Sequence, residues 1–218
     1  METLSSTEED YLKTIYNLQK EGANVVSTNE ISNSLNIKAS TVTDMLKKLS
    51  SKKLIKYKPY YGTSLAKKGN SLALALVRKH RLWETFLVEH LGFEWSEVHD
   101  IAEQLEHVNS EKLVNNLDEF MGFPKVDPHG DPIPSKNGEI EYSDFKNLCE
   151  TPVGNSVSFC GVRDSNSDFL EYLTSINLSI GKKITIVEVI DYDESIRINT
   201  GNELITLSKK VSKNILVK

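Results

Sequence analysis

Apolar residues follow a helical spacing in the first part of this chain and a strand spacing in the last part. Up to residue 121 they recur three and four positions apart, whereas beyond residue 150 short runs alternate between polar and apolar residues. Residues 122–150 lie between these parts and hold four of the six prolines. Proline fixes the backbone and removes a hydrogen-bond donor, so this stretch is interpreted as a linker-like loop. The change of period predicts a mainly α protein with a small β domain.

The N-terminal part predicts a winged helix-turn-helix over residues 1–70. Two short helices, the second over residues 39–51, follow a longer first helix over residues 7–21, and a basic hairpin around residues 59–62 forms the wing. Capping boxes are expected ahead of the first two helices. Their members are Ser5 with Glu8 or Ser6 with Glu9, and Ser27 with Glu30.

The remainder predicts two further domains joined by a linker. Residues 71–122 form a helical domain, residues 123–150 the linker, and residues 151–218 a small barrel of short strands with glycine at the turns. The expected helices are 67–91, 96–108, 110–121 and 168–176. The expected strands are 156–160, 183–189, 195–199, 203–207 and 215–217.

Positive charge is concentrated in one segment. The whole chain has a net charge of -5, yet residues 38–68 contain nine lysines and one acid, which gives that segment +8. A basic patch on an acidic protein favours phosphate, and hence double-stranded DNA, as a partner. A solvated lysine-rich surface is the alternative. The residues expected to face DNA are Lys38, Ser40, Thr41, Thr43, Asp44, Lys47, Lys48, Lys56, Lys58 and Tyr60 or Tyr61.

Histidines and acids with helical spacing indicate a divalent metal. As a helix, residues 96–108 place two of each on one face, and a His–Glu pair four residues apart lies upstream. Imidazole and carboxylate groups are metal ligands. A solvated helix face is the alternative for either group alone. The residues are His99, Glu103, Glu106 and His107, with His80 and Glu84 upstream.

Other features of the sequence bear on the cellular compartment and on membrane contact. No apolar run approaches the roughly 20 residues that span a bilayer, and the polar N-terminus does not resemble a signal peptide. Cys149 and Cys160 lie outside any Cys-x-x-Cys spacing and are interpreted as reduced thiols. We expect a cytoplasmic protein without membrane contact.

Six strings within these elements resemble the diphtheria-toxin-repressor family of metal-dependent transcriptional regulators, most closely its manganese-responsive branch. They are "TEEDYLKTIYNL", "ASTVTDMLKKL", "LAKKG", "RKHRLWETFL", "VHDIAEQLEHV" and "PHGDPIP". The resemblance covers nearly the whole chain. It implies a winged helix, a helical metal-binding and dimerisation domain, and a C-terminal SH3-like barrel related to a ferrous-transport accessory protein. The implied partners are an operator DNA duplex and a second copy of the chain.

The resemblance also implies two groups of metal ligands. The first is Asp10, Glu103, Glu106 and His107, with His80 contributing in the manganese branch. The second is Glu84 with His99, or Glu84 with Asp127 and His129 of the Pro-rich loop and Asp164 or Asp168 of the barrel.

Two departures from the family pattern bear on the metal. Lys13 stands where the manganese branch often has a glutamate, which argues against a closely spaced two-metal cluster. Asp10 and Glu103 stand where the iron branch has methionine and cysteine. Carboxylates in place of sulfur suit a harder ion, so we expect Mn²⁺, with Fe²⁺ as the alternative.

These expectations combine into a dimeric repressor of metal-uptake genes with Mn²⁺ as co-repressor, and not an enzyme. The metal would tie the first helix, through Asp10, to the helix carrying Glu106 and so fix the spacing of two DNA-reading heads. One alternative is a metal-dependent hydrolase, although the sequence has no nucleophile elbow, phosphate loop or H-E-x-x-H motif. The other is a winged-helix regulator that senses an organic ligand.

Overall fold

The computed structural model describes residues 4–20, 22, 24–201 and 203–218, and the chain divides into two compact units. Unit 1 contains the described residues up to His80, Gln104–Glu111 and Pro134–Glu139. Unit 2 contains Arg81–Glu103, Lys112–Ile133 and Ile140–Lys218. The protein is mainly helical with a small β domain, as the change of period predicted. Among the described residues, no helix combines the length and the apolar character needed to cross a membrane.

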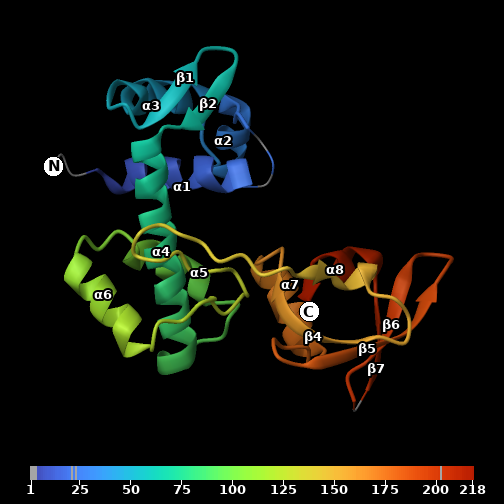
Figure 1. The fold of residues 1–218 in the computed structure, drawn as a ribbon. Coiled ribbons are helices and arrows are strands. Elements are labelled where there is room, and N and C mark those ends of the chain that lie inside the picture. Colours follow the sequence, from blue (N-terminus) through green and yellow to red (C-terminus); the bar gives the residue numbers. More distant parts are fainter. Residues whose placement is uncertain (1–3, 21, 23, 202) are drawn as a thin grey trace. The chain divides into compact units, whose positions relative to one another are not determined.

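Unit 1 is a winged helix-turn-helix (Figure 1). An antiparallel hairpin forms the wing, in register from Ile55 opposite Leu65 to Lys58 opposite Gly62. In Figure 1 the wing and α1 lie on opposite sides of this unit. The elements are α1 (Ser6–Lys20), α2 (Thr28–Ser34), α3 (Ala39–Ser51), β1 (Ile55–Lys58), β2 (Gly62–Leu65) and the first part of α4 (Lys67–Leu91), up to His80.

Local signals explain where these helices begin. The Ser5 hydroxyl accepts the backbone N–H of Glu8, whose carboxylate accepts the N–H of Ser5, so the first predicted capping box is present. Ser27 and Glu30 form the second in the same way. At the start of α4, Gly69 is required by packing, because a Cβ there would lie 2.0 Å from the carbonyl oxygen of Leu54.

The core of unit 1 joins α1 to the helix-turn-helix. The apolar positions predicted for α1 and α3 are buried together, and each such side chain contributes roughly 1.5–3 kcal/mol by leaving water. Helices α1 and α3 therefore share one packed core. The fully buried members include Tyr11, Leu12, Ile15, Ile31, Val42, Leu46 and Leu49.

The helical part of unit 2 contains the rest of α4, most of α5 (Val98–Leu105) and α6 (Glu111–Phe120). Leu82 of α4 packs against Val114 and Leu117 of α6. The helix predicted over 96–108 is shorter than expected, because it ends at Leu105 and residues 106–107 form a turn. Side chains of α1 and α4 contact these two turn residues, as described below. These contacts outweigh the helical spacing of the sequence.

The C-terminal part of unit 2 is a six-stranded antiparallel sheet in the order β3-β8-β4-β5-β6-β7. Two β-bulges bend it, one between Phe159 and Gly161 and one between Ile186 and Glu188. Phe159, Ile184 and Ile198 lie in its core. The strands are β3 (Lys146–Asn147), β4 (Ser156–Val162), β5 (Lys183–Ile190), β6 (Ser195–Asn199), β7 (Leu204–Leu207) and β8 (Ile215–Val217), with η1 (Leu148–Glu150), α7 (Ser167–Ser175) and α8 (Lys209–Lys213) as short helices.

Parts of the segment predicted as a linker are built into unit 2. Leu148 is fully buried in the C-terminal core, and β3 pairs with β8. Asp127 and His129 are also buried. Gly130, at φ +89°, passes so close to β4 that a Cβ would lie 2.3 Å from the carbonyl oxygen of Cys160. Prolines correctly indicate turns here, but local sequence does not reveal that the turns pack against β4.

Candidate metal centre

Each unit brings one group of acids and histidine close enough to hold a metal ion. In unit 1 the group is Asp10, Glu106 and His107, called here the Asp10 cluster. In unit 2 it is Glu84, Asp127 and His129, called the Glu84 cluster. Within each group the ligand atoms lie within 4.8 Å of one another. Their oxygen and nitrogen donors fit a divalent ion such as Mn²⁺, Fe²⁺ or Zn²⁺.

His107 connects the turn after α5 to α1 within the Asp10 cluster. It lies in the turn after α5, and its Nε2 is 3.0 Å from Oδ1 of Asp10 on α1. Its Nδ1 is 2.7 Å from Oε2 of Glu9, the neighbour of Asp10. The side chain of Asp10 is 40% exposed and that of His107 is 20% exposed, so solvent reaches this cluster.

Glu106 is the buried member of the Asp10 cluster. Its Oε1 is 2.7 Å from Nζ of Lys13, and its Oε2 is 2.5 Å from Nδ1 of His80. Burial alone would raise the pKa of Glu106, but His80 and Lys13 outweigh it and hold the pKa below its usual value. Nearby carboxylates also act on Lys79. Burial lowers the pKa of its ammonium group, and the negative charges of Glu9 and Glu106 oppose that shift. Glu106 is therefore a carboxylate held ionised in a buried position.

The expectation that His99, Glu103, Glu106 and His107 share one helical face is wrong. Since α5 ends at Leu105, the last two do not continue that face. Glu103 instead lies with His99, its Oε1 3.6 Å from Nε2. The other ring nitrogen of His99, Nδ1, is 3.5 Å from Oε1 of Glu84. The helical period correctly predicted that His99 and Glu103, four residues apart, lie together. It did not hold beyond Leu105, where the helix ends.

His129 in the Glu84 cluster is held on both sides of its ring. Nε2 is 2.8 Å from the carbonyl oxygen of Trp95, and Nδ1 is 3.7 Å from Oε2 of Glu84. The Trp95 ring stacks on the imidazole with centroids 6.2 Å apart. Burial alone would lower the pKa of His129, but Glu84, Asp127 and the Trp95 carbonyl outweigh it and raise the pKa to about 9. This histidine has a charge partner even without a metal.

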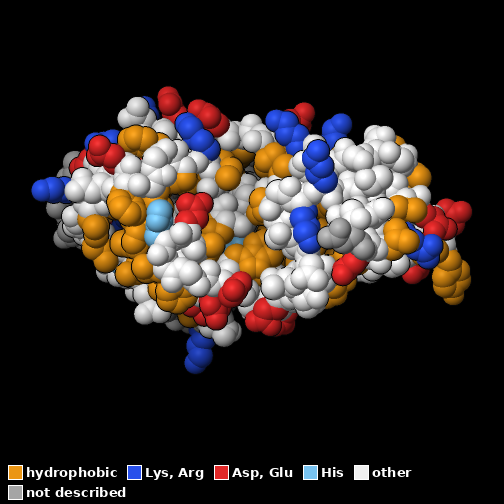
Figure 2. Space-filling view, turned by 90° about the horizontal axis from the view of Figure 1, so that it is seen from below, with side chains coloured by type: hydrophobic (Ala, Val, Ile, Leu, Met, Phe, Trp, Pro, Cys, Tyr) orange, Lys and Arg blue, Asp and Glu red, His pale blue; other side chains and the backbone are white. Residues whose placement is uncertain are grey.

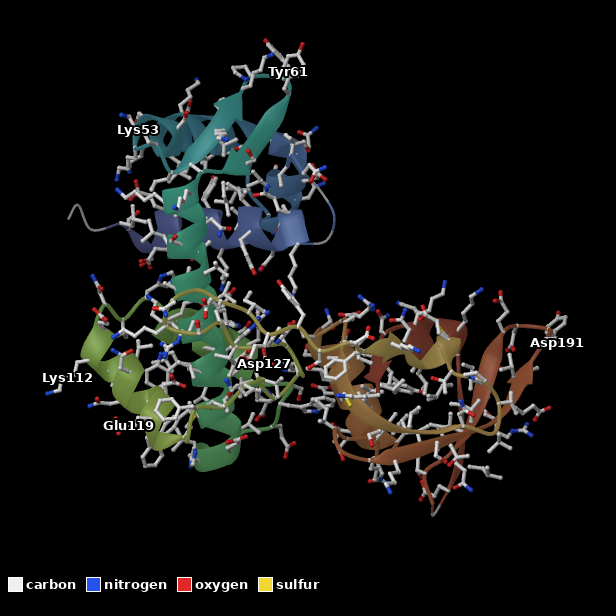
Figure 3. The ribbon with its side chains drawn as sticks, viewed as in Figure 1. Lys53, Tyr61, Lys112, Glu119, Asp127 and Asp191 are labelled. Carbon is white, nitrogen blue, oxygen red and sulfur yellow. The ribbon has the colours of Figure 1, made fainter. Side chains whose placement is uncertain are left out.

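Asp127, labelled in Figure 3, folds the loop that carries it. Its Oδ1 accepts the backbone N–H groups of His129 and Asp131 at 2.9 and 3.0 Å. Its Oδ2 is 3.4 Å from Nε of Arg81, which also reaches Asp131 and the Pro132 carbonyl. Burial raises the pKa of Asp127 to about 7, with Glu84 and Asp131 adding to the shift and Arg81 opposing it. Much of its acceptor capacity is used by these contacts.

The two barrel acids expected as possible ligands have local partners. Asp164 accepts the backbone N–H of Asn166, whose side chain accepts the N–H of Asp168 at the start of α7. Among the described residues, neither acid belongs to a group of potential ligands within 4.8 Å. Asn166 is thus the N-cap of α7 and Asp164 supports the turn before it, while a ligand role for Asp164 or Asp168 stays a prediction.

Four residues that shape these clusters were not predicted as site residues. Glu9, Lys13, Arg81 and Trp95 contact His107, Glu106, Asp127 and His129 respectively. Lys13 was noted only as a departure from a pattern. A charged residue next to a predicted ligand was the one available signal for Glu9 and Arg81, and local sequence offered none for Trp95.

The DNA-facing residues predicted in unit 1 fall into outward-facing and internally paired groups. Thr43 is half-buried, and its hydroxyl donates to the carbonyl of Ala39. Lys48 is 3.2 Å and Lys52 2.7 Å from the buried carboxylate of Glu8, which ties α3 to α1. Lys48 is nevertheless exposed, as are Lys38, Ser40, Thr41, Asp44 and Lys47, the last two paired at 3.3 Å.

The wing is exposed at its predicted contact residues. Lys56 and Lys58 project from β1, and Tyr60 occupies the turn at φ +67°. The Lys58 ammonium lies 3.9 Å from the ring centroid of Tyr61, at the tip of the wing (Figure 3). Cationic and aromatic groups at a hairpin tip are suited to phosphate and sugar contact.

Three family models match successive parts of the chain. Residues 3–63 match the iron-dependent repressor N-terminal DNA-binding domain, and residues 66–135 match the metal-binding and dimerisation domain of the same repressors. Residues 146–218 match the FeoA domain. The fold and these matches define a modular DNA-binding regulator.

Curated relatives and solved structures identify the family. The iron-dependent repressor IdeR of Mycobacterium tuberculosis is 37% identical over 168 residues, covering 72% of this chain and 71% of that protein. The diphtheria toxin repressor of Corynebacterium glutamicum is 30% identical, covering 86% of each. A manganese-dependent transcriptional repressor in complex with manganese is 33% identical, covering 96% and 98% of the two chains, with a TM-score of 0.84. The chain belongs to the diphtheria-toxin-repressor family of metal-dependent transcriptional repressors, and is a regulator rather than an enzyme.

Proposed function

We propose that the chain acts in the cytoplasm as a homodimeric repressor of metal-uptake genes, and binds its operator when Mn²⁺ occupies the Asp10 cluster. Fe²⁺ is the alternative metal. The observation that carries this proposal is the convergence of Asp10 with Glu106 and His107 from segments far apart in the sequence. Carboxylate and imidazole ligands suit Mn²⁺ and Fe²⁺ alike. The relatives divide in the same way, since one is named manganese-dependent and another iron-dependent.

The proposed response rests on charge at the Asp10 cluster. Without a metal ion, the carboxylates of Glu9, Asp10 and Glu106 repel one another, although Lys13, Lys79 and His80 offset part of that charge. A bound divalent ion would supply the missing positive charge. Asp10 would then hold α1 to the turn that carries Glu106 and His107. Because α1 shares a core with α3, the state of this cluster would bias the DNA-reading helix.

The proposed dimer surface lies on the helical part of unit 2. Phe120 of α6 contacts Phe86 and His90 of α4, with ring centroids 6.1 and 5.0 Å apart, yet remains largely exposed. On the left of Figure 2 hydrophobic side chains gather around an exposed histidine over these helices. An exposed apolar patch of this kind is typical of a protein interface. The exposed large apolar residues of this helical part include Leu91, Leu113, Phe120 and Phe123.

Metal titration of DNA binding tests the proposed function. An operator selected from a random duplex pool in the presence of Mn²⁺ would be titrated with Mn²⁺, with Zn²⁺, and with Fe²⁺ under anaerobic conditions. His107→Ala should lower metal-dependent affinity by about 100-fold or more, since even supporting partners of metal ligands are worth 10–100-fold. His129→Ala is the matched control from the Glu84 cluster and should have a smaller effect. Operator binding that ignores all three metals would rule out the proposal.

A further inference from the structure

We infer that Glu9 is a positioning residue that sets which ring nitrogen of His107 is presented to the metal. This inference rests on the proposed metal-binding function of the Asp10 cluster. Glu9 stands outside the ligand residues expected from the sequence, and among the described residues the grouped ligand atoms on α1 belong to Asp10 rather than to Glu9. Its carboxylate nevertheless makes the shorter of the two contacts to the ring, 2.7 Å against 3.0 Å for Asp10.

A neutral imidazole can carry its proton on either nitrogen, and only the other nitrogen has a lone pair for a metal. Without a metal, both ring nitrogens face carboxylates, Nδ1 towards Glu9 and Nε2 towards Asp10. A metal ion held by Asp10 would replace the proton of Nε2, while Glu9 continues to accept the hydrogen bond from Nδ1–H. Carboxylates in this supporting position also raise the basicity of the ligating nitrogen. The Glu9 contact therefore prepares Nε2 for coordination.

The location of His107 explains why it requires such a partner. It lies in the turn that follows α5 rather than within the helix. Glu9 and His107 are partly exposed, at 26% and 20%, so water competes for the ring nitrogens. A carboxylate from α1 supplies the orientation that the turn itself does not.

The Glu84 cluster offers an internal comparison with the opposite arrangement. There the Trp95 carbonyl, which can only accept, takes the hydrogen bond from Nε2 of His129. Nδ1 is the nitrogen that faces Glu84. Because His107 and His129 have opposite partners, a change at Glu9 should alter the signals of His107 and leave those of His129 unchanged.

The test is long-range ¹H–¹⁵N correlation of the histidine rings in the full chain, metal-free and loaded with Zn²⁺ as a diamagnetic probe. His107→Ala assigns the relevant signals. Zn²⁺-loaded wild type should show His107 protonated at Nδ1, with Zn²⁺ on Nε2. Glu9→Ala should allow Zn²⁺ on either ring nitrogen and give a 10–100-fold loss of Zn²⁺ affinity. Glu9→Gln keeps an acceptor oxygen without the charge, so it should retain the Nδ1–H tautomer and lose less affinity.

Two outcomes would overturn the inference. One is a Glu9→Ala variant with unchanged tautomer and unchanged Zn²⁺ affinity. The other is equal loss of affinity in Glu9→Ala and Glu9→Gln with the tautomer intact, which would make Glu9 a ligand itself. Failure of the proposed function is distinguishable, because Asp10→Ala would then leave Zn²⁺ binding unchanged, whereas failure of this inference alone would leave Asp10→Ala deficient in Zn²⁺ binding. Circular dichroism and melting temperature verify that each variant is folded.

Discussion

The Asp10 cluster and the Glu84 cluster both crowd carboxylates beside a histidine, but they neutralise the negative charge differently. In the Glu84 cluster, Arg81 pairs with Asp127 inside unit 2, and all three cluster residues are buried. In the Asp10 cluster Lys13 pairs with Glu106, while Asp10 remains partly exposed. A cluster whose negative charge is paired with a buried arginine contributes mainly to the stability of the fold. A cluster that solvent reaches is better suited to respond to an external cation.

Arg81→Met would test this contrast with the largest expected effect. Removing the guanidinium leaves buried Asp127 with only His129 as a cationic neighbour, so the free energy of unfolding should fall by about 3 kcal/mol. Urea denaturation measures the change. Arg197→Met is the matched control, because Arg197 pairs with Glu188 at an exposed site and its loss should cost less than about 1 kcal/mol. Equal losses would mean that Arg81 does not close the Glu84 cluster.

Glu8 extends the comparison to a buried acid of unit 1. Burial alone would raise its pKa, but Lys52, the Ser5 backbone N–H and Lys48 outweigh it and lower the pKa to about 2. The folded-state pKa therefore lies below the ordinary value of 4.5, so the stabilisation is present above pH 4.5 and is lost as pH falls toward 2.

Glu8→Gln should accordingly lower the free energy of unfolding by roughly 2 kcal/mol at pH 7. The difference from wild type should shrink between pH 4.5 and 2, because wild-type Glu8 takes up a proton over that range. Denaturation across a pH series measures it. Glu119→Gln, at an exposed position on α6, is the control and should show little difference at any pH. A pH-independent loss would show that the contacts, and not the ionised form, are what matter.

Lys56→Ala has the smallest expected effect and separates DNA contact from the metal clusters. Lys48 and Lys52 are paired with Glu8, whereas Lys56 is exposed on β1. Losing one phosphate contact should weaken all duplexes alike and reduce the slope of log affinity against log salt by about one unit. Lys112→Ala, an exposed lysine of α6, should leave the slope unchanged. An unchanged slope in Lys56→Ala would assign the wing to packing instead.

Local sequence patterns predicted most of the fold. The helices 39–51 and 67–91 and the strands 195–199 and 215–217 have the expected bounds, because periodicity, capping residues and glycines act over a few neighbouring positions. The short elements β3 and α8 were not predicted, since they are stabilised by β8 and by the C-terminal sheet rather than by a pattern of their own.

The sequence by itself determined which chemical groups were available, namely carboxylates, imidazoles and a lysine-rich wing, and on which elements most of them lie. Only the tertiary structure decided which of them meet. It ended α5 at Leu105, placed Glu9 against His107, and closed the Pro-rich loop around Arg81. The physical reason is the separation along the chain over which each interaction acts. Helical and strand periods are set by neighbouring residues, whereas the partners of a buried or partly buried charge come from whichever distant segments packing brings beside it.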